Sequence, residues 1–108
     1  MKIIENSAKR LELRIDGAVT AGLCILDRNT GEAEITRFII GLPYSKRRVS
    51  LAQVSDITVK RPNARKAYYA TLRLTSGDDV VLAGTTKDDA MDVARAIRDF
   101  LRAKPVAG

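Results

Sequence analysis

The chain has no histidine and no tryptophan, and it has a single cysteine, Cys24, among its 108 residues. The lack of histidine removes the commonest general base near neutral pH and the commonest metal ligand. One cysteine cannot form an internal disulfide or a thiolate zinc cluster. Because Cys24 stands in an alternating strand pattern and no neighbour in sequence would clearly lower its pKa, we expect a buried small hydrophobic residue rather than a reactive thiol.

Long apolar runs are also absent. No run approaches the roughly 18 apolar residues that a membrane-spanning helix needs, and the N-terminal MKIIENSAKR lacks the apolar core of a signal peptide. We therefore expect an intracellular, cytoplasmic location. The length predicts a single domain over residues 1–108, and the apolar fraction of 45% and charged fraction of 30% are typical of a folded globular protein.

The sequence contains no HExxH, GxSxG or GxxxxGK[ST] motif. Its adjacent acid pairs, Asp78 with Asp79 and Asp88 with Asp89, fall at a predicted hairpin turn and at a predicted helix start, so each has a structural explanation. We expect no catalytic site, no cofactor and no metal, and we predict that the protein is not an enzyme.

Positive charge is unevenly placed. Residues 44–73 hold eight of the basic residues and one acid, a net charge of +7 in a chain whose total is +6. Such a stretch favours anionic partners: nucleic acid, phosphorylated ligands or a membrane surface. The candidate anion-binding or partner-binding residues are Lys46, Arg47, Arg48, Lys60, Arg61, Arg65 and Lys66. The alternative is that the run 46–48, whose first and last members share one face of a strand, only keeps a sheet edge soluble.

Alternation of apolar and polar residues predicts about seven short strands over residues 9–84. They are centred on KRLELRI, VTAGLCILD, AEITRFII, YSKRRVSL, SDITVKR, YYATLRLT and VVLAG. The segment DRNTGE supplies the Asn and Gly that a tight hairpin turn needs. The expected fold class is therefore mainly β (α+β), with a bent antiparallel sheet or an open barrel.

From residue 86 to about 103 the apolar period becomes that of an amphipathic helix. Its stripe consists of Ala90, Val93, Ala94, Ile97 and Leu101, widened by Phe100. Thr86 and Asp89 have the spacing of a capping box, and Pro105 ends the helix before a frayed tail at 104–108. The stripe has to cover a sheet, so we expect the helix to plug one end of it.

The segment FIIGLPY, residues 38–44, is dense in apolar side chains. It has three interpretations: core, a subunit interface, or a surface that dips into a membrane. We expect core.

The ordered series CILDRNTGEAEI, SLAQVSDITV, YYATLRLTSGDDVVLAG and DDAMDVARAIRDFL resembles the pleckstrin-homology-like superfold, in particular its small bacterial domains. The resemblance covers roughly residues 9–103. In several such bacterial proteins a pair of membrane helices precedes the strand that carries ldR.tG. The resemblance therefore leaves open a membrane-anchored parent with a hairpin between residues 15 and 23, where this chain has only IDGAVTAG.

The expected function is that of a non-catalytic interaction or assembly module. It would bind a protein segment, at a sheet edge or beside the helix, or self-associate. The first alternative is peripheral binding of anionic lipid headgroups through the basic residues, although the Lys/Arg signature of phosphoinositide-binding pleckstrin-homology domains is missing from the first turn, DGAVTAG. The second alternative is nucleic-acid binding. It is disfavoured because one of the two aromatic residues beside the basic loop, Tyr68 and Tyr69, should face the core of its strand, and because the C-terminal helix is rich in acids at its start.

Overall fold

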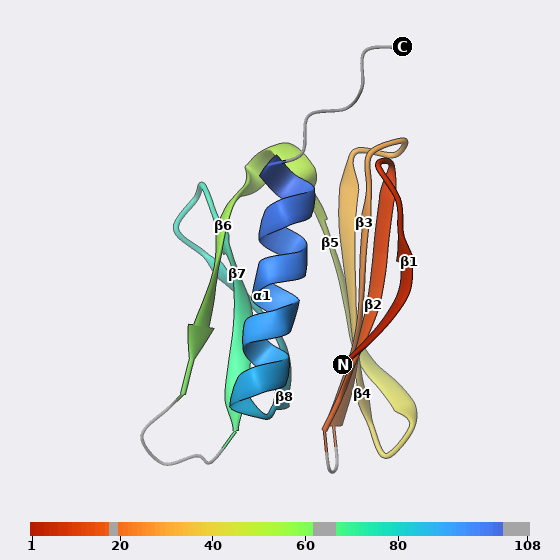
Figure 1. Cartoon of the computed structure of the whole chain (residues 1–108), viewed down its shortest axis with the longest axis vertical. Helices are drawn as coiled ribbons and strands as arrows, with labels where there is room; N and C mark the ends of the chain where they lie inside the picture. Colours follow the sequence, from red (N-terminus) through yellow and green to blue (C-terminus); the bar gives the residue numbers. More distant parts are fainter. Residues whose placement is uncertain (18–19, 62–66, 103–108) are drawn as a thin grey trace.

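The computed structural model describes residues 1–17, 20–61 and 67–102. In these ranges the chain forms eight strands, a short 3-10 helix and one α-helix (Figure 1). The elements are β1 (Lys2–Asn6), β2 (Arg10–Asp16), β3 (Thr20–Asp27), β4 (Glu32–Ile39), β5 (Leu42–Ser50), η1 (Leu51–Gln53), β6 (Val54–Lys60), β7 (Tyr68–Leu74), β8 (Asp79–Thr85) and α1 (Lys87–Arg102). The seven predicted strands correspond to β2 through β8. The additional strand is β1, which shows no alternation because all five of its residues are exposed. Its pairing with β2 shifts between Ile3 and Glu5.

The strands divide between two antiparallel sheets, which do not close into a barrel. The larger sheet has the order β1-β2-β3-β4-β5 and the smaller one has the order β6-β7-β8. Figure 1 shows α1 lying lengthwise between the two sheets. The mainly β fold class with one C-terminal helix is therefore confirmed, but the helix fills the open side between the sheets and does not plug one end.

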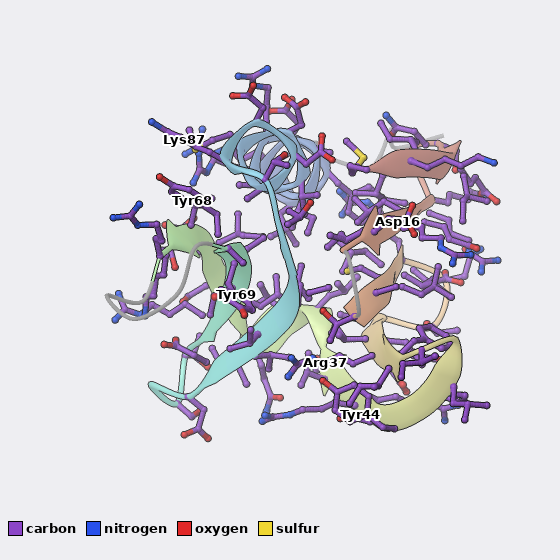
Figure 2. All side chains as sticks on the ribbon, turned by 90° about the horizontal axis from the view of Figure 1, so that it is seen from below. Asp16, Arg37, Tyr44, Tyr68, Tyr69 and Lys87 are labelled. Atoms are coloured by element: carbon purple, nitrogen blue, oxygen red, sulfur yellow. The ribbon has the colours of Figure 1, made fainter. Side chains whose placement is uncertain are left out.

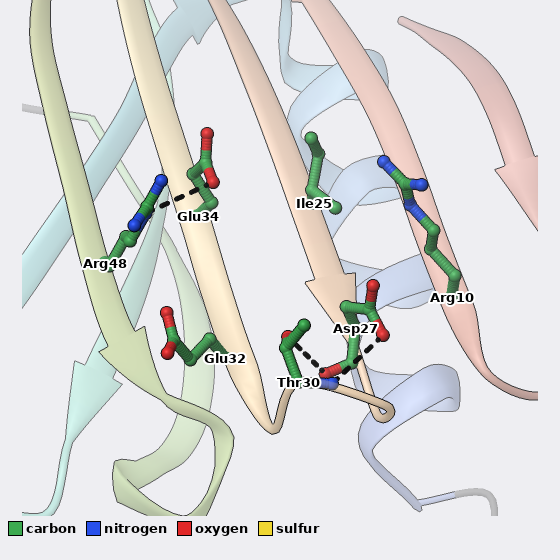
Figure 3. Close-up of a pocket in the computed structure, with 7 residues that line it drawn as sticks. All are labelled: Arg10, Ile25, Asp27, Thr30, Glu32, Glu34 and Arg48. Carbon is green, nitrogen blue, oxygen red and sulfur yellow. Dashed lines mark hydrogen bonds and ion pairs between the residues drawn. The ribbon is translucent and has the colours of Figure 1, made fainter.

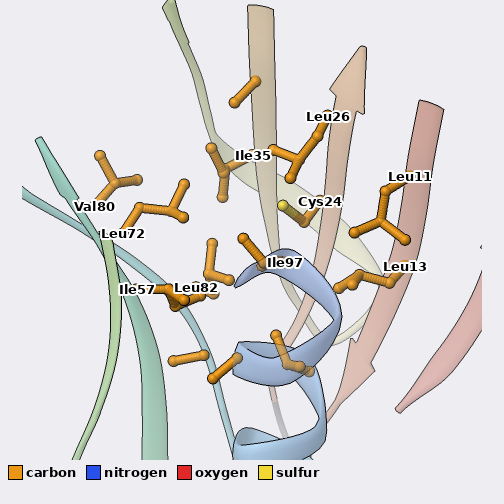
Figure 4. Packing of buried hydrophobic residues seen from close by; sticks show 14 of the residues in the cluster. Leu11, Leu13, Cys24, Leu26, Ile35, Ile57, Leu72, Val80, Leu82 and Ile97 are labelled. Atoms are coloured by element: carbon orange, nitrogen blue, oxygen red, sulfur yellow. The ribbon is translucent and has the colours of Figure 1, made fainter. Parts of the chain in front are cut away.

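The hydrophobic core lies where the inner faces of both sheets meet α1 (Figure 4). In β2, β3 and the first half of β4 alternate residues point into it, as the period of two predicted. The largest fully buried side chains are Leu11, Leu13, Ile15, Leu26, Ile57, Leu72, Leu82, Ile97, Val93 and Cys24. Each large aliphatic side chain of this kind stabilises the fold by about 1.5–3 kcal/mol relative to an exposed one.

Both ends of α1 are tied to other elements. At the N-terminal end the backbone N–H of Asp89 donates to Oγ1 of Thr86 at 3.2 Å, which confirms the predicted helix cap. At the C-terminal end Arg28, from the turn between β3 and β4, donates to the carbonyl of Phe100 and lies over its ring, 4.4 Å from the centroid. Nε of Arg28 also donates to the carbonyl of Ala8 at 2.9 Å. Arg28 therefore joins the helix end to two turns of the larger sheet.

Candidate functional site

The hairpin between β4 and β5 presents apolar side chains to solvent. Its two turn residues, Ile40 and Gly41, both have positive φ, 50° and 76°. The side chains of Ile40 and Leu42 are 80% and 71% exposed, and Ile39 and Tyr44 are also exposed. The prediction that residues 38–44 belong to the core is therefore wrong for this part of the segment. In Figure 1 the tip of the hairpin lies at the same end of the molecule as the start of α1.

Ile40 is an unfavourable choice for its position. A β-branched residue with positive φ is a true conformational outlier and costs about 1–2 kcal/mol. Two-residue turns with positive φ at both positions favour Asn-Gly, not Ile-Gly. Because an exposed Ile40 adds nothing to the core and strains the backbone, the hairpin tip, residues 39–42, is a candidate binding element.

A β-bulge sets which side chains of the hairpin share a face. Phe38 pairs with Pro43, but the next residue, Arg37, pairs with Ser45, so Tyr44 is the extra residue. Beyond the bulge Arg47 stands opposite Ile35, whose side chain faces the core. Arg37, Ser45 and Arg47 therefore lie on the inner side of the β4–β5 pair.

Lys46 and Arg48 lie on the outer face, where they share one carboxylate. Nζ of Lys46 lies 3.0 Å from Oε1 of Glu34, and Nε of Arg48 lies 3.4 Å from Oε2. The hydrogen bond from Lys46 is the main cause that lowers the pKa of Glu34, and the charges of both cations add to it against a smaller opposing effect of burial. Much of the positive charge on the outer face is therefore compensated.

Figure 3 shows a shallow hollow on this outer face, on the side of the sheet away from α1. Its volume is about 310 Å³, and it is lined by Arg10, Ile25, Asp27, Thr30, Glu32, Glu34 and Arg48. Its charges are of both signs and largely engaged: Arg10 binds Glu12 at 2.9 Å, and Asp27 accepts the backbone N–H of Asn29 at 2.8 Å. With two cations and three acids in its lining, the hollow has no excess positive charge that would attract an anion.

The inner side differs, because two arginines there lack a counter-charge. Among the described residues neither Arg37 nor Arg47 takes part in an ion pair. The guanidinium of Arg37 lies 5.3 Å from the ring centroid of Tyr44. Figure 2 shows that both residues lie far from α1. The sequence indicated Arg47 but missed Arg37, Ser45 and Tyr44, because nothing in the local pattern reveals the pairing of β4 with β5.

The remaining predicted basic residues do not join this group. Lys60 lies at the end of β6, in the smaller sheet, and binds Asp79 at 3.0 Å. Arg61 lies over the ring of Tyr68, 5.7 Å from its centroid. Arg65 and Lys66 lie outside the described residues. The described members of the predicted set are therefore divided: three lie on β5, and Lys60 and Arg61 lie at and just after the end of β6.

A second surface, beside the helix, was also predicted as a binding region. A groove of about 460 Å³ runs between β6 and α1. At the strand edge of this groove, neighbouring side chains occupy the backbone groups of Ile57. Its N–H donates to Oδ1 of Asp56 at 2.7 Å, and its carbonyl accepts from Arg98 at 2.9 Å. Those backbone groups are already occupied, which disfavours the addition of a peptide strand at this point.

The described part of the chain offers little for metal binding, thiol chemistry or a membrane-spanning helix. It contains no cluster of three or more His, Cys, Asp or Glu residues that could hold a metal ion. Burial raises the pKa of the Cys24 thiol to about 12, so the reactive thiolate is scarce near neutral pH. No helix in the described ranges is both long enough and apolar enough to cross a membrane.

Comparison with known proteins leaves the site as the basis for assigning a function. A scan against protein families, a search of curated proteins and a search of solved structures found no match to this chain. The resemblance to pleckstrin-homology-like domains therefore stays a prediction from the sequence.

Proposed function

We propose that this domain is a non-catalytic binding module that docks on anionic membrane surfaces through the tip of the β4–β5 hairpin. The observation that carries the proposal is Ile40, an 80% exposed aliphatic side chain held at a φ of 50°. Leu42 lies across the turn, where it pairs with Ile39. Arg37 lies on β4, two residues before Ile39. Apolar side chains at a projecting tip with cations behind them match the layers of a membrane surface, acyl chains first and charged headgroups next.

The energetics make both features necessary. Inserting Ile40 and Leu42 contributes at most about 1.5–3 kcal/mol each, since each side chain still has some contacts in the free protein. Each arginine near an anionic surface adds about 1 kcal/mol. Neither contribution alone holds a protein on a membrane, so binding should require anionic lipid and weaken as salt screens the charges.

Self-association and peptide binding are less well supported by the same surfaces. The free edge of β5 carries three consecutive cations, residues 46–48, and pairing two copies of this edge would bring like charges together. The edge of β6 is capped at Ile57. Nucleic-acid binding lacks a free stacking platform at Tyr68, whose ring is already covered by Arg61.

The test is to replace Ile40→Asn and to measure co-sedimentation with vesicles of phosphatidylcholine, with and without phosphatidylserine. Asn tolerates positive φ, so this variant should unfold at a higher temperature, by a few degrees for about 1 kcal/mol. Its binding to phosphatidylserine vesicles should fall about tenfold through the lost aliphatic surface. If Ile40→Asn is more stable than the unmodified protein and still binds vesicles less tightly, unfolding does not explain the weaker binding.

The matched control is Ile4→Asn, which makes the same chemical change at an isoleucine that is 49% exposed on β1, at the opposite edge of the sheet. Its vesicle binding should equal that of the unmodified protein. The proposal is overturned if the unmodified protein ignores phosphatidylserine vesicles, or if Ile40→Asn binds as well as the unmodified protein. Concentration-dependent mass that Ile40→Asn abolishes, without vesicle binding, would identify the tip as a contact between copies of this chain instead.

A further inference from the structure

Two arginines and a serine come together on the inner side of the β4–β5 pair. Arg37 stands directly opposite Ser45, and Arg47 follows two residues along β5, on the same face. Diagonal neighbours of this kind have Cα atoms about 7–8 Å apart, within reach of long side chains. We call Arg37, Ser45 and Arg47 the phosphate cradle.

The cradle has donors without acceptors. Nε of Arg37 is buried and has no hydrogen-bond partner, so the donors that Arg37 can offer a ligand are those of its two Nη groups. Ser45 and Arg47 are exposed, and no described acid forms an ion pair with either arginine. Glu34 lies on β4, next to the residue that pairs with Arg47. Its side chain points to the other face of the sheet, where it binds Lys46 and Arg48. The unsatisfied charge is therefore confined to one side of the hairpin.

We propose that the cradle binds a phosphomonoester group, an inference that rests on the proposed membrane function and identifies the lipid headgroup chemistry that it recognises. Guanidinium groups form paired hydrogen bonds with phosphate oxygens, and the Ser45 hydroxyl supplies a further donor. Two arginine charges match a phosphomonoester, which carries about −1.5 to −2 near neutral pH. A phosphodiester carries a single charge and offers fewer free oxygens.

The position of the cradle along the hairpin fits this ligand. Arg37 lies two residues from Ile39, about 7 Å along the strand, and Arg47 is two pairs further from the tip. The headgroup layer of one leaflet is about 5–8 Å thick. With the tip inserted about 7 Å below the boundary of the acyl chains, Arg37 is level with that boundary and Arg47 is level with the outer headgroups. The phosphate of a phosphomonoester lipid attached directly to glycerol then lies between the two arginines.

The experiment compares vesicles that contain phosphatidic acid, a phosphomonoester lipid, with phosphatidylserine vesicles adjusted to the same surface charge. The unmodified protein should bind phosphatidic acid about tenfold more tightly, as expected for additional charged hydrogen bonds. Arg47→Lys keeps the charge but loses the paired donors, so the preference should disappear while phosphatidylserine binding remains. The matched control is Arg48→Lys, the same change at the next residue but on the opposite face, which should keep the preference.

A second experiment uses a soluble phosphomonoester, so that binding to the cradle is measured without a membrane. Glycerol 3-phosphate, titrated into the free protein, should shift the backbone amide resonances of Ser45 and Arg37, and Arg47→Lys should weaken those shifts. If phosphatidylserine and phosphatidic acid bind equally and glycerol 3-phosphate causes no shift, the cradle is overturned and the membrane proposal survives. If no vesicle binds but the shifts appear and depend on Arg47, the cradle is supported and the membrane proposal falls. If neither vesicle binds and no shift appears, both fall.

Discussion

Cys24 shows at the level of one residue how burial controls chemistry. Its side chain points from β3 into the core and is 1% exposed. Loss of hydration disfavours the thiolate and raises the pKa from 9.0 to about 12. The expected small hydrophobic role is confirmed, because a residue in the middle of a regular alternation takes the face that its neighbours take.

The raised pKa predicts a loss of stability in alkali. The folded protein holds its thiol proton more tightly than the unfolded chain, so this contribution is complete below pH 9 and is lost as the pH rises from 9 toward 12. The free energy of unfolding should fall across this range about 1.4 kcal/mol per pH unit more steeply in the unmodified protein than in Cys24→Ala. Urea unfolding at several alkaline pH values measures the difference, and parallel curves would contradict it.

Ile40 shows the opposite case, a residue for which local composition misleads. Phe38, Ile39 and Ile40 form an apolar run that is typical of core, yet exposure increases along it toward the turn. The turn lies beyond the last residue pair of β3 with β4, Thr20 with Ile39, and no second layer of the described chain covers it. The residue type was legible in the sequence, but its surroundings were not.

At the scale of elements, the β4–β5 pair is held partly by the ion pairs of Glu34 with Lys46 and Arg48. Because the folded-state pKa of Glu34 is lowered, this contribution is present above the ordinary value of 4.5 and is lost as the pH falls below it. Glu34→Gln should therefore cost up to about 1 kcal/mol at pH 7, the usual limit for a partly exposed pair.

Unfolding by urea at pH 7 and pH 3 checks this expectation. The difference between Glu34→Gln and the unmodified protein should shrink at pH 3, below the ordinary pKa of 4.5, where the carboxyl of the unfolded chain is protonated and the contribution of the lowered pKa is being lost. An equal difference at both pH values would mean that the substitution acts through packing and not through charge.

The bulge at Tyr44 decides which cations lie together. A hairpin without it, built on the same turn, would pair Ile35 with Lys46 and would place Lys46 and Arg48 on the inner side. The extra residue reverses the faces, so that Arg47 joins Arg37 and the other two cations meet Glu34. Alternation within β5 was predicted correctly, but the sequence of one strand cannot specify its register against another.

At the scale of the whole molecule, the two sheets come into close contact where β3 meets β8. A Cβ atom on Gly22 would lie 3.0 Å from the Cβ of Ala83, closer than almost all real contacts. The absence of a side chain at Gly22 is therefore what allows this approach.

Gly22→Val should separate the sheets locally and destabilise the protein by about 1–3 kcal/mol, the usual cost of overpacking. Ala21→Val, the neighbouring position on the outer face, should change stability little, because Ala21 is only half-buried and valine favours strands. Thermal unfolding of both variants measures the contrast. Equal effects of the two substitutions would show that the close approach does not limit packing.

The sequence by itself determined the type and order of the strands from β2 to β8 and of α1, the net charge and the buried role of Cys24. These features depend on residues close together in the chain, through periods of two and 3.6 residues and through turn and cap chemistry. Only the tertiary structure decided the division into two sheets, the lengthwise position of α1, the exposure of Ile40 and the grouping of Arg37 with Arg47. Each of these depends on the pairing and packing of segments whose relative position no local pattern encodes, and a shift of a single residue in register moves every side chain of a strand to the other face.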